Sequence, residues 1–322
     1  MKNLFCVIVS AVLVTFSAGS FAQDFPNRRV TLEVGFGAGG ATDVVARILA
    51  QKLGDEWNQP VIVVNRTGAS GTLATDFVAK SAPDGYTMLV TSPTSTAAAP
   101  GMFPRLPYNV VKDFVVITEI ATTPFLLVVP VSSSFKTFGD LIEYAKAHPS
   151  ELSYGSGGLG AQGQLATELL NQWLHLKVMH VPYKGESGAF TDLVSGRLSF
   201  MFVTLGAAIP LIDSGKLRAL AVSSLERSEF AKDIPTIAEL GFPGFETESW
   251  NALYAPSSMP ASLVARINED VVKVLKMPET IALFRQQAFK TVGNSSAQAT
   301  AYLKSETEKW GGVIKAANIG AK

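Results

Sequence analysis

Residues 30–43 read VTLEVGFGAGGATD, and this is the segment that decides the fold. The β-branched run Val30–Phe36 predicts a buried strand, and the apolar period of Asp43–Leu53 predicts a helix. Between them, Gly35–Asp43 forms a glycine-rich loop that lets the backbone turn sharply and bring bare N–H groups close to a ligand. The following helix adds the positive end of its dipole. This loop can therefore hold an anion without a basic side chain.

A second glycine-rich loop, Gly155–Gln162, follows a predicted strand at Leu152–Tyr154 and precedes a predicted helix at Gln164–Leu174. Two such loops, one in each half of the chain, can face each other across a cleft and grip one anion from both sides. Hydrogen bonds to a charged group contribute roughly 1.5–3 kcal/mol each. A few of them would supply most of the about 8 kcal/mol of a micromolar complex. The alternative is that each loop is only a tight turn that needs glycine.

Strands and helices alternate along most of the chain, which predicts an α/β protein built from βαβ units around parallel sheets. After the first loop, a helix at Gly71–Lys80 lies between strands at Val61–Val64 and Tyr86–Thr91. A second series follows the Pro/Gly/Ser/Thr-rich stretch Ser92–Pro107. It contains a helix at Thr137–Ala147 and strands at Phe125–Val129, Val178–Val181, Leu198–Phe202 and Arg218–Val222. The chain closes with helices at Ala261–Leu275, Pro278–Gln286 and Ala297–Ala317. We therefore predict two lobes, each a Rossmann-like sheet flanked by helices, with lobe 1 at residues 23–123 and 254–322 and lobe 2 at residues 124–253. The helical tail should pack back on the first lobe.

The first 22 residues have the layout of a secretory signal peptide. Lys2 supplies the positive start, Leu4–Phe16 the apolar stretch, and Ser20 and Ala22 the small residues before a cut after Ala22. We expect residues 1–22 to be removed on export to the periplasm, together with Cys6, the only cysteine of the chain. An uncleaved anchor is the alternative, although the apolar stretch is short for a membrane span.

Composition narrows the classes of function. Lys2 is one of 27 basic residues, so the exported chain keeps 26 basic against 27 acidic residues. It therefore has no excess of positive charge that would attract nucleic acid. Without a thiol it has no disulfide, cysteine nucleophile or thiolate metal site. The three histidines show no metal spacing. Ser156 lies between glycines, but Tyr154 occupies the first glycine position of a nucleophile elbow. We therefore expect no catalytic constellation, no metal and no cofactor.

The run Gly35-x-Gly37-x-x-Gly40 also matches the dinucleotide fingerprint, with the required strand before it and helix after it. Arg66, after the second strand, would then bind the 2′-phosphate of NADP. Export argues against this, because the periplasm has no ready supply of reduced nicotinamide. Tyr144 also has a histidine, not a lysine, four positions later, so no Tyr-x-x-x-Lys pair is present. An NADP-dependent oxidoreductase is the less favoured alternative, and we expect that the chain is not an enzyme.

Further motifs are spread over nearly the whole exported chain. They are PNRRVTL (26–32), FGAGGATD (36–43), VNRTGASG (64–71), APDGYT (82–87), LPYN (106–109) with DF (113–114), HVPYKG (180–185), GKLRALAV (215–222), PTIAELG (235–241), Trp250 and AP (255–256). In this order they resemble the tripartite tricarboxylate transporter solute receptors, also called Bug-type periplasmic binding proteins. So many ordered matches are far more specific than a glycine motif alone.

The resemblance implies a two-lobed type II periplasmic binding fold, and a small carboxylate held by backbone amides and waters. The contacts that it implies are Phe36, Ala38, Gly39, Gly40 and Asp43 in the first loop, Ser92 and Thr94 in a segment crossing between the lobes, and Ser156, Gly157, Ala161, Gln162, Gln164, Tyr183 and Thr204 in the second lobe. It also implies a monomer that delivers its ligand to the membrane permease subunits of a tripartite tricarboxylate transporter. A periplasmic sensing subunit of a two-component system uses the same fold and is the alternative.

The chain departs from the family pattern in the loops that should touch ligand. Gly35-Phe36 stands where Pro-Phe is frequent, residues 160–166 (GAQGQLA) where Gly-Ser-x-x-His-Leu-Ala is frequent, and Val203 where an aspartate is frequent. A less polar cleft follows, and with it the hypothesis that the distal part of the ligand is apolar or aromatic. An aromatic carboxylate and a dicarboxylate are the two ligand types that we leave open. Asp43 also has a second interpretation, as a first-turn acid that stabilises its helix.

Overall fold

The computed structural model describes residues 25–320. The predicted signal peptide and Cys6 lie outside the described residues. Among residues 25–320, no helix is both long and apolar enough to cross a membrane. The same residues contain no group of three or more His, Cys, Asp or Glu side chains placed to hold a metal ion.

The first sheet contains the strand that opens the sequence. β1 (Val30–Val34) pairs in parallel with β2 (Val61–Asn65) on one side and β3 (Thr87–Thr91) on the other. The next strand is β9 (Glu248–Pro256), which runs antiparallel to β3. Helices α1 (Ala41–Trp57) and α2 (Thr72–Ala79) connect the parallel strands, as the alternating pattern predicted.

The second sheet repeats this arrangement. Its parallel strands are β5 (Ser153–Ser156), β6 (Met179–Pro182) and β7 (Phe200–Thr204). Strand β8 (Leu217–Val222) runs in the same direction as β7, because both pair antiparallel with one longer strand. The helices of this sheet are α4 (Phe138–Ala147), α5 (Gln162–Leu174), α6 (Glu186–Val194) and α7 (Leu205–Asp213). The sequence patterns did not predict α6 or α7. The second of these begins immediately after β7, so no glycine or proline marks the change from strand to helix.

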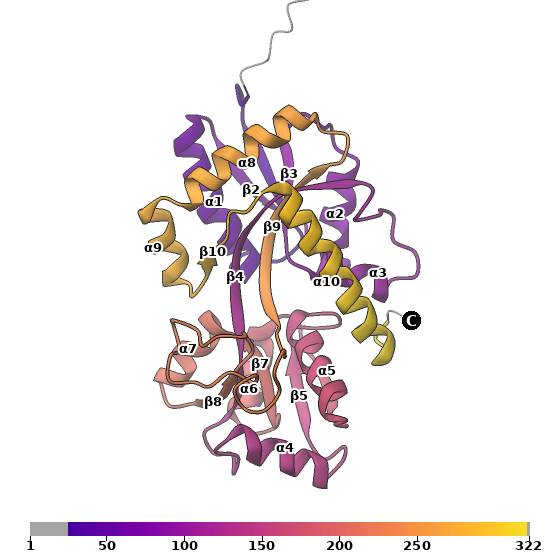
Figure 1. Ribbon diagram of the computed structural model, residues 1–322, viewed down its shortest axis with the longest axis vertical. Coiled ribbons are helices and arrows are strands. Elements are labelled where there is room, and N and C mark those ends of the chain that lie inside the picture. The colour runs from indigo at the N-terminus through magenta and orange to yellow at the C-terminus, as the bar shows by residue number, and fades with distance from the viewer. Residues whose placement is uncertain (1–24, 321–322) are drawn as a thin grey trace, which may run out of the picture.

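One long strand, β4 (Phe114–Pro130), belongs to both sheets (Figure 1). Its residues up to Pro124 pair with β9 in the first sheet, and from Phe125 onward it pairs with β7 and β8 in the second. All of β9, including residues 248–253, lies in the first sheet. The lobe boundaries predicted at 123/124 and 253/254 stay predictions, but the change of sheet inside β4 falls one residue from the first of them.

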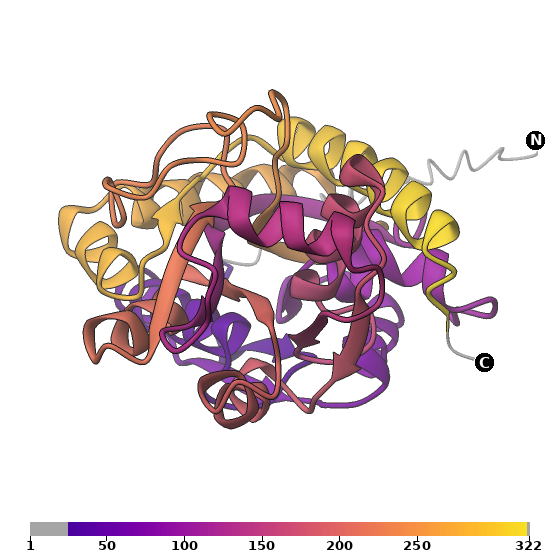
Figure 2. The same ribbon diagram turned by 90° about the horizontal axis from the view of Figure 1, so that it is seen from below.

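The C-terminal segment is helical, as predicted, and packs on both halves of the molecule. It contains α8 (Ala261–Leu275), α9 (Pro278–Gln286), the short β10 (Lys290–Thr291) and α10 (Ser296–Ala316). Helix α8 packs on α1, whereas α10 packs on β4 and reaches α5 of the second lobe, where Gln172 Nε2 donates to Val313 O at 3.0 Å. Seen from below, the yellow α10 lies along the outer edge of the molecule (Figure 2).

The stretch Ser92–Pro107, predicted to interrupt the pattern, contains a π-helical turn, η2 (Thr94–Ala98), and the short helix α3 (Ala99–Met102). Ser92 and Thr94 were expected in a segment that crosses between the lobes, and this is wrong. They follow β3 at its carboxyl end, and the connections between the sheets are made by β4 and by the chain entering β9.

Candidate functional site

The carboxyl ends of the parallel strands lie at one edge of each sheet, and these two edges meet. Ser70, shortly after β2, donates its Oγ hydrogen to the carbonyl oxygen of Leu159, after β5, at 3.4 Å. A Cβ atom on Gly160 would lie 2.0 Å from Sδ of Met102 on α3. In open α/β sheets this is the edge at which ligands bind. Both glycine loops lie here.

The first glycine loop is shaped by the carboxylate of Asp43, which is 1% exposed. Its Oδ2 accepts hydrogen bonds from the Gly39 N–H and from Arg47 Nε, both at 2.8 Å. Its Oδ1 accepts from Asn65 Nδ2 at 2.8 Å, and the same nitrogen donates to Phe36 O at 2.9 Å. Asp43 and Asn65 thus hold both sides of the loop, and the N–H of Gly39 is already occupied.

Burial opposes ionisation of Asp43, but the hydrogen bonds from Arg47, the Gly39 N–H and Asn65 outweigh it. The pKa of this carboxyl group is therefore lowered. Asp43 is ionised at neutral pH, and its carboxylate holds the loop through the Gly39 N–H. The interpretation as a first-turn acid is compatible with this geometry, because Asp43 also stabilises the start of α1.

Helices α1 and α5 both begin without a side-chain cap. Their N-cap residues, Gly40 and Ala161, offer no side-chain oxygen, and the first N–H groups of a helix have no acceptor within it. Of the described helices, only α4 and α10 begin with complete capping boxes, at Thr137 and Ser295, so α1 and α5 are distinguished by the glycine loops before them and not by the missing cap alone. The segment from Gly37 to Ala41 is exposed. The N-termini at the two glycine loops can therefore accept an external anion.

The second glycine loop is shaped by a neutral network. Gln164 Oε1 accepts the Gly160 N–H at 2.7 Å, which turns its Nε2 toward His180 Nδ1 at 3.1 Å. Nδ1 must then accept, so Nε2 carries the proton and donates to Ser156 Oγ at 2.6 Å. Ser156 Oγ in turn donates to Gly158 O at 3.0 Å.

This network explains why a serine beside a histidine is not an activated nucleophile here. Burial lowers the pKa of His180 to about 4, so its ring is neutral. Nε2 is a donor in this tautomer and cannot take the proton of Ser156. The ring also stacks on Tyr154, with the two centroids 4.9 Å apart. His180 therefore belongs to the scaffold of the loop.

The other predicted contacts occupy different places at the same edge. Ser92 and Thr94 are buried, and Phe36 is half-buried against the core with its ring near Gly71. Gln162 Oε1 accepts from Ser249 Oγ at 2.7 Å, which ties the start of α5 to β9. Tyr183 donates its hydroxyl to Asp192 at 2.6 Å. The roles of these residues as ligand contacts stay predictions.

Three residues at this edge were not predicted. Asn65 is the last residue of β2, at the strand end where side chains of α/β sites gather, and that position is a signal that could have identified it. Glu186 starts α6, which the sequence patterns did not reveal, and it accepts a hydrogen bond from Thr204 Oγ1 at 2.9 Å. Asn251 on β9 is fully buried, and neither of its amide atoms has a hydrogen-bond partner among the described residues.

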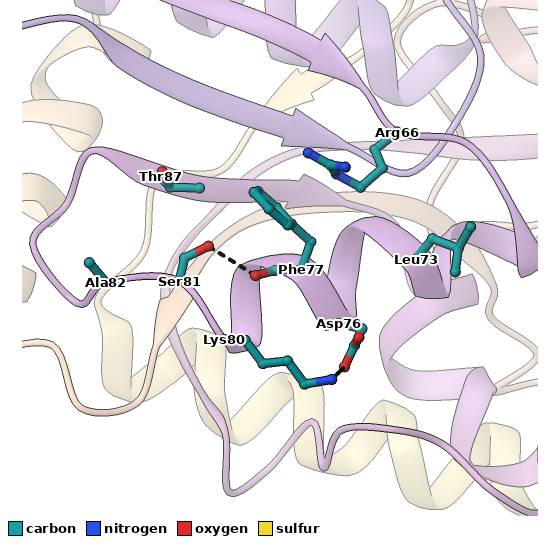
Figure 3. Close-up of a pocket in the computed structure, with 8 residues that line it drawn as sticks. All are labelled: Arg66, Leu73, Asp76, Phe77, Lys80, Ser81, Ala82 and Thr87. Carbon is teal, nitrogen blue, oxygen red and sulfur yellow. Dashed lines mark hydrogen bonds and ion pairs between the residues drawn. The ribbon is translucent and has the colours of Figure 1, made fainter.

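The structure changes the interpretation of two positions that the sequence analysis singled out, Val203 and Arg66. Val203 is fully buried in an apolar cluster, so its side chain belongs to the core. Glu186 places a carboxyl group against the next residue of the strand, Thr204. Arg66 is held by other side chains: its guanidinium pairs with Glu33 at 3.2 Å. It also stacks on the ring of Phe77, 3.7 Å from the centroid, and Figure 3 shows these two side chains together. The guanidinium that an NADP site would need is engaged elsewhere.

The fold and the site together define a two-lobed α/β solute-binding protein. The family model described as tripartite tricarboxylate transporter family receptor matches residues 45–319. The chain belongs to this family. Protein BugT of Bordetella pertussis is 35% identical over 324 residues, which are 100% of this chain and 99% of that protein. The fold class and the family expected from the sequence are confirmed.

Solved structures agree with this assignment. The structure described as R. palustris Rpa4515 with adipate has a TM-score of 0.84 and 35% identity, and covers 92% of this chain and 100% of that one. The structure of the periplasmic binding protein BugD has a TM-score of 0.80 and 29% identity, with coverage of 92% and 100%. The chain is thus a receptor of the Bug type, and the relatives with solved structures include periplasmic proteins.

Proposed function

We propose that this protein binds a small carboxylate between its two glycine loops in the periplasm and delivers it to a tripartite tricarboxylate-type membrane transporter. The observation that supports this most is the pair of uncapped helices, α1 and α5, at the edges where the two sheets meet. One carboxylate can accept N–H groups from both. Each such bond contributes roughly 1.5–3 kcal/mol.

Lobe closure is the second part of the proposal. The two sheets are joined by β4 and by the chain that enters β9, so few backbone segments must bend when the lobes move. A carboxylate bridging the loops stabilises the closed arrangement, and permease subunits can recognise the surface formed across both lobes. A sensing subunit would present the same surface to a different membrane protein. The adipate of the R. palustris relative supports a carboxylate ligand.

The engaged guanidinium of Arg66 and the donor role of His180 Nε2 favour a receptor over an NADP-dependent or serine-dependent enzyme.

A thermal-shift screen tests the ligand class. Saturation at a hundredfold excess over the Kd stabilises the protein by about 2.7 kcal/mol. We expect this shift with aliphatic or aromatic carboxylates. Stabilisation by citrate or glutamate alone would contradict the apolar distal end, and no shift with any carboxylate would contradict the proposed function.

A cap substitution tests the position of the carboxylate. Ala161→Asp places a carboxylate at the N-cap of α5, where the backbone already has extended geometry (φ −59°, ψ 145°). It should stabilise the helix by about 1 kcal/mol and weaken carboxylate binding. Ala161→Asn is the matched control, because it caps the helix without the charge. Gly40→Asp and Gly40→Asn repeat the test at α1. Unchanged affinity in both Asp variants would place the ligand elsewhere.

A further inference from the structure

Glu186 lies among the residues of the second lobe that we expect to surround the ligand. It is the first residue of α6, and its backbone nitrogen would lie 3.2 Å from a Cβ atom on Gly157 in the second glycine loop. Its Oε2 accepts the hydroxyl of Thr204 at 2.9 Å. Thr204 is both the last residue of β7 and the N-cap of α7. The carboxyl group of Glu186 therefore lies between the second glycine loop and the start of α7.

This position is one that a free anion would otherwise favour. Helix α7 begins without a cap from Thr204, whose hydroxyl is turned to Glu186 instead. The positive end of α7 and the Thr204 hydroxyl attract negative charge. Glu186 supplies that charge from within the protein. A ligand carboxylate at the same place would meet the half-buried carboxylate of Glu186, and like charges placed side by side repel.

No cation compensates Glu186 among the described residues. On α6 and the adjoining loop, Tyr183 and Arg197 both bind Asp192, at 2.6 and 2.9 Å. Lys184 precedes α6 and is exposed. The packed strand β7 carries no ionisable side chain, and Tyr154 on β5 faces His180 and Glu168. Burial raises the pKa of Glu186 to about 7, against the opposing hydrogen bonds from Thr204.

We propose that Glu186 is a specificity-determining residue, whose carboxyl group occupies the anion position at α7 and selects ligands with an uncharged distal end. The receptor then prefers a monocarboxylate to a dicarboxylate of the same length. This inference rests on the proposed function, because the proximal carboxylate is still held by α1 and α5. It also gives a physical reason for an apolar or aromatic distal group that does not depend on Val203.

Two matched ligand pairs test this inference by calorimetry: hexanoate with adipate, and benzoate with terephthalate. At pH 8, where Glu186 is ionised, wild-type protein should bind the monocarboxylate of a pair more tightly. Glu186→Gln keeps the shape and the Thr204 contact but removes the charge, and Glu186→Ala vacates the position. Both should shift the ratio of affinities toward the dicarboxylate, by on the order of tenfold, which corresponds to one pKa unit of differential interaction. Glu143→Gln, an exposed carboxylate on α4, is the control and should leave the ratio unchanged.

Wild-type protein offers a second measurement that needs no variant. Between about pH 8 and pH 6 Glu186 becomes protonated, so the relative affinity for the dicarboxylate should rise as the pH falls. Glu186→Gln should lack this dependence. If wild-type protein binds no carboxylate of the thermal-shift screen, the proposed function fails and this inference with it. If carboxylates bind but the ratio is the same in wild type and both variants, only the role of Glu186 is overturned.

Discussion

In the first glycine loop, the ionised carboxylate of Asp43 accepts the Gly39 N–H, whereas in the second loop the neutral amide of Gln164 accepts the Gly160 N–H. The acceptor lies four residues after the donor in both loops. Asp43 is balanced by Arg47, and Gln164 by the neutral ring of His180. Two loops can thus present the same uncapped helix end on scaffolds of different charge. We expect the two scaffolds to lose stability under different conditions.

The largest expected effect is at the charged scaffold. Asp43→Ala leaves the Gly39 N–H and Asn65 Nδ2 without their acceptor, and Arg47 without its partner. We expect a loss of about 3 kcal/mol in the free energy of unfolding, because several hydrogen bonds to one charged group are lost together. Urea denaturation measures it. Asp55→Ala, exposed on the same helix, is the control and should cost little. Equal losses in the two variants would mean that Asp43 has no special role.

A matched glycine pair compares the space around the loops. Gly39 and Gly160 have similar φ values, +79° and +72°, but a Cβ on Gly39 meets nothing within 4 Å. Gly39→Ala should cost about 1 kcal/mol for its backbone conformation. Gly160→Ala should cost about 2 kcal/mol more, because it also overpacks Met102.

The partner of Gly160 supplies a check on this pair. Met102→Ala should remove part of the extra cost of Gly160→Ala in a double-mutant cycle. The same substitution should not change the cost of Gly39→Ala. Additive effects of Met102→Ala and Gly160→Ala would show that the two loops are equally free of neighbours.

The neutral scaffold should be sensitive to moderate acid. His180 has an ordinary pKa of 6.5 and one of about 4 in the fold. As the pH falls between these values, the unfolded chain takes up a proton that the folded chain does not, so stability falls with pH, by about 2 kcal/mol. His180→Gln should remove this contribution. Glu186, with its raised pKa, acts in the opposite direction, so wild type and variant must be compared at each pH.

Chemical denaturation across this pH range measures the difference between wild type and His180→Gln. His148→Gln, at an exposed position, should follow the wild-type curve. If His180→Gln also follows it, the second loop does not depend on a neutral imidazole.

The smallest expected effect concerns Asn251. It lies two residues before Leu253 in β9, so both side chains point to the face of the strand that packs against α1. Asn251→Leu removes two buried polar atoms without partners and should raise stability by about 1 kcal/mol. Calorimetry then distinguishes two roles. Weaker carboxylate binding would make Asn251 a ligand contact near the first loop, whereas unchanged binding would limit it to packing.

Local patterns predicted much of the fold. The helices at Ala261–Leu275 and Pro278–Gln286 are found at the predicted residues, because their apolar period and flanking prolines are local signals. The first half of β4, all of β9 and helices α6 and α7 were not predicted. Strand β9 is almost continuously buried and shows no alternation, and its partners β3 and β4 are distant in sequence. Such a strand exists only because its neighbours provide hydrogen bonds on both sides.

The candidate site divides in the same way. The sequence by itself determined the two glycine loops and the helices after them, because glycine conformation and apolar period act over a few residues. Only the tertiary structure decided that Asn65 holds the first loop, that His180 and Gln164 hold the second, and that Glu186 faces Thr204. Hydrogen bonds between distant segments depend on which strands lie side by side. That order is set by the packing of the whole core, and no local pattern contains it.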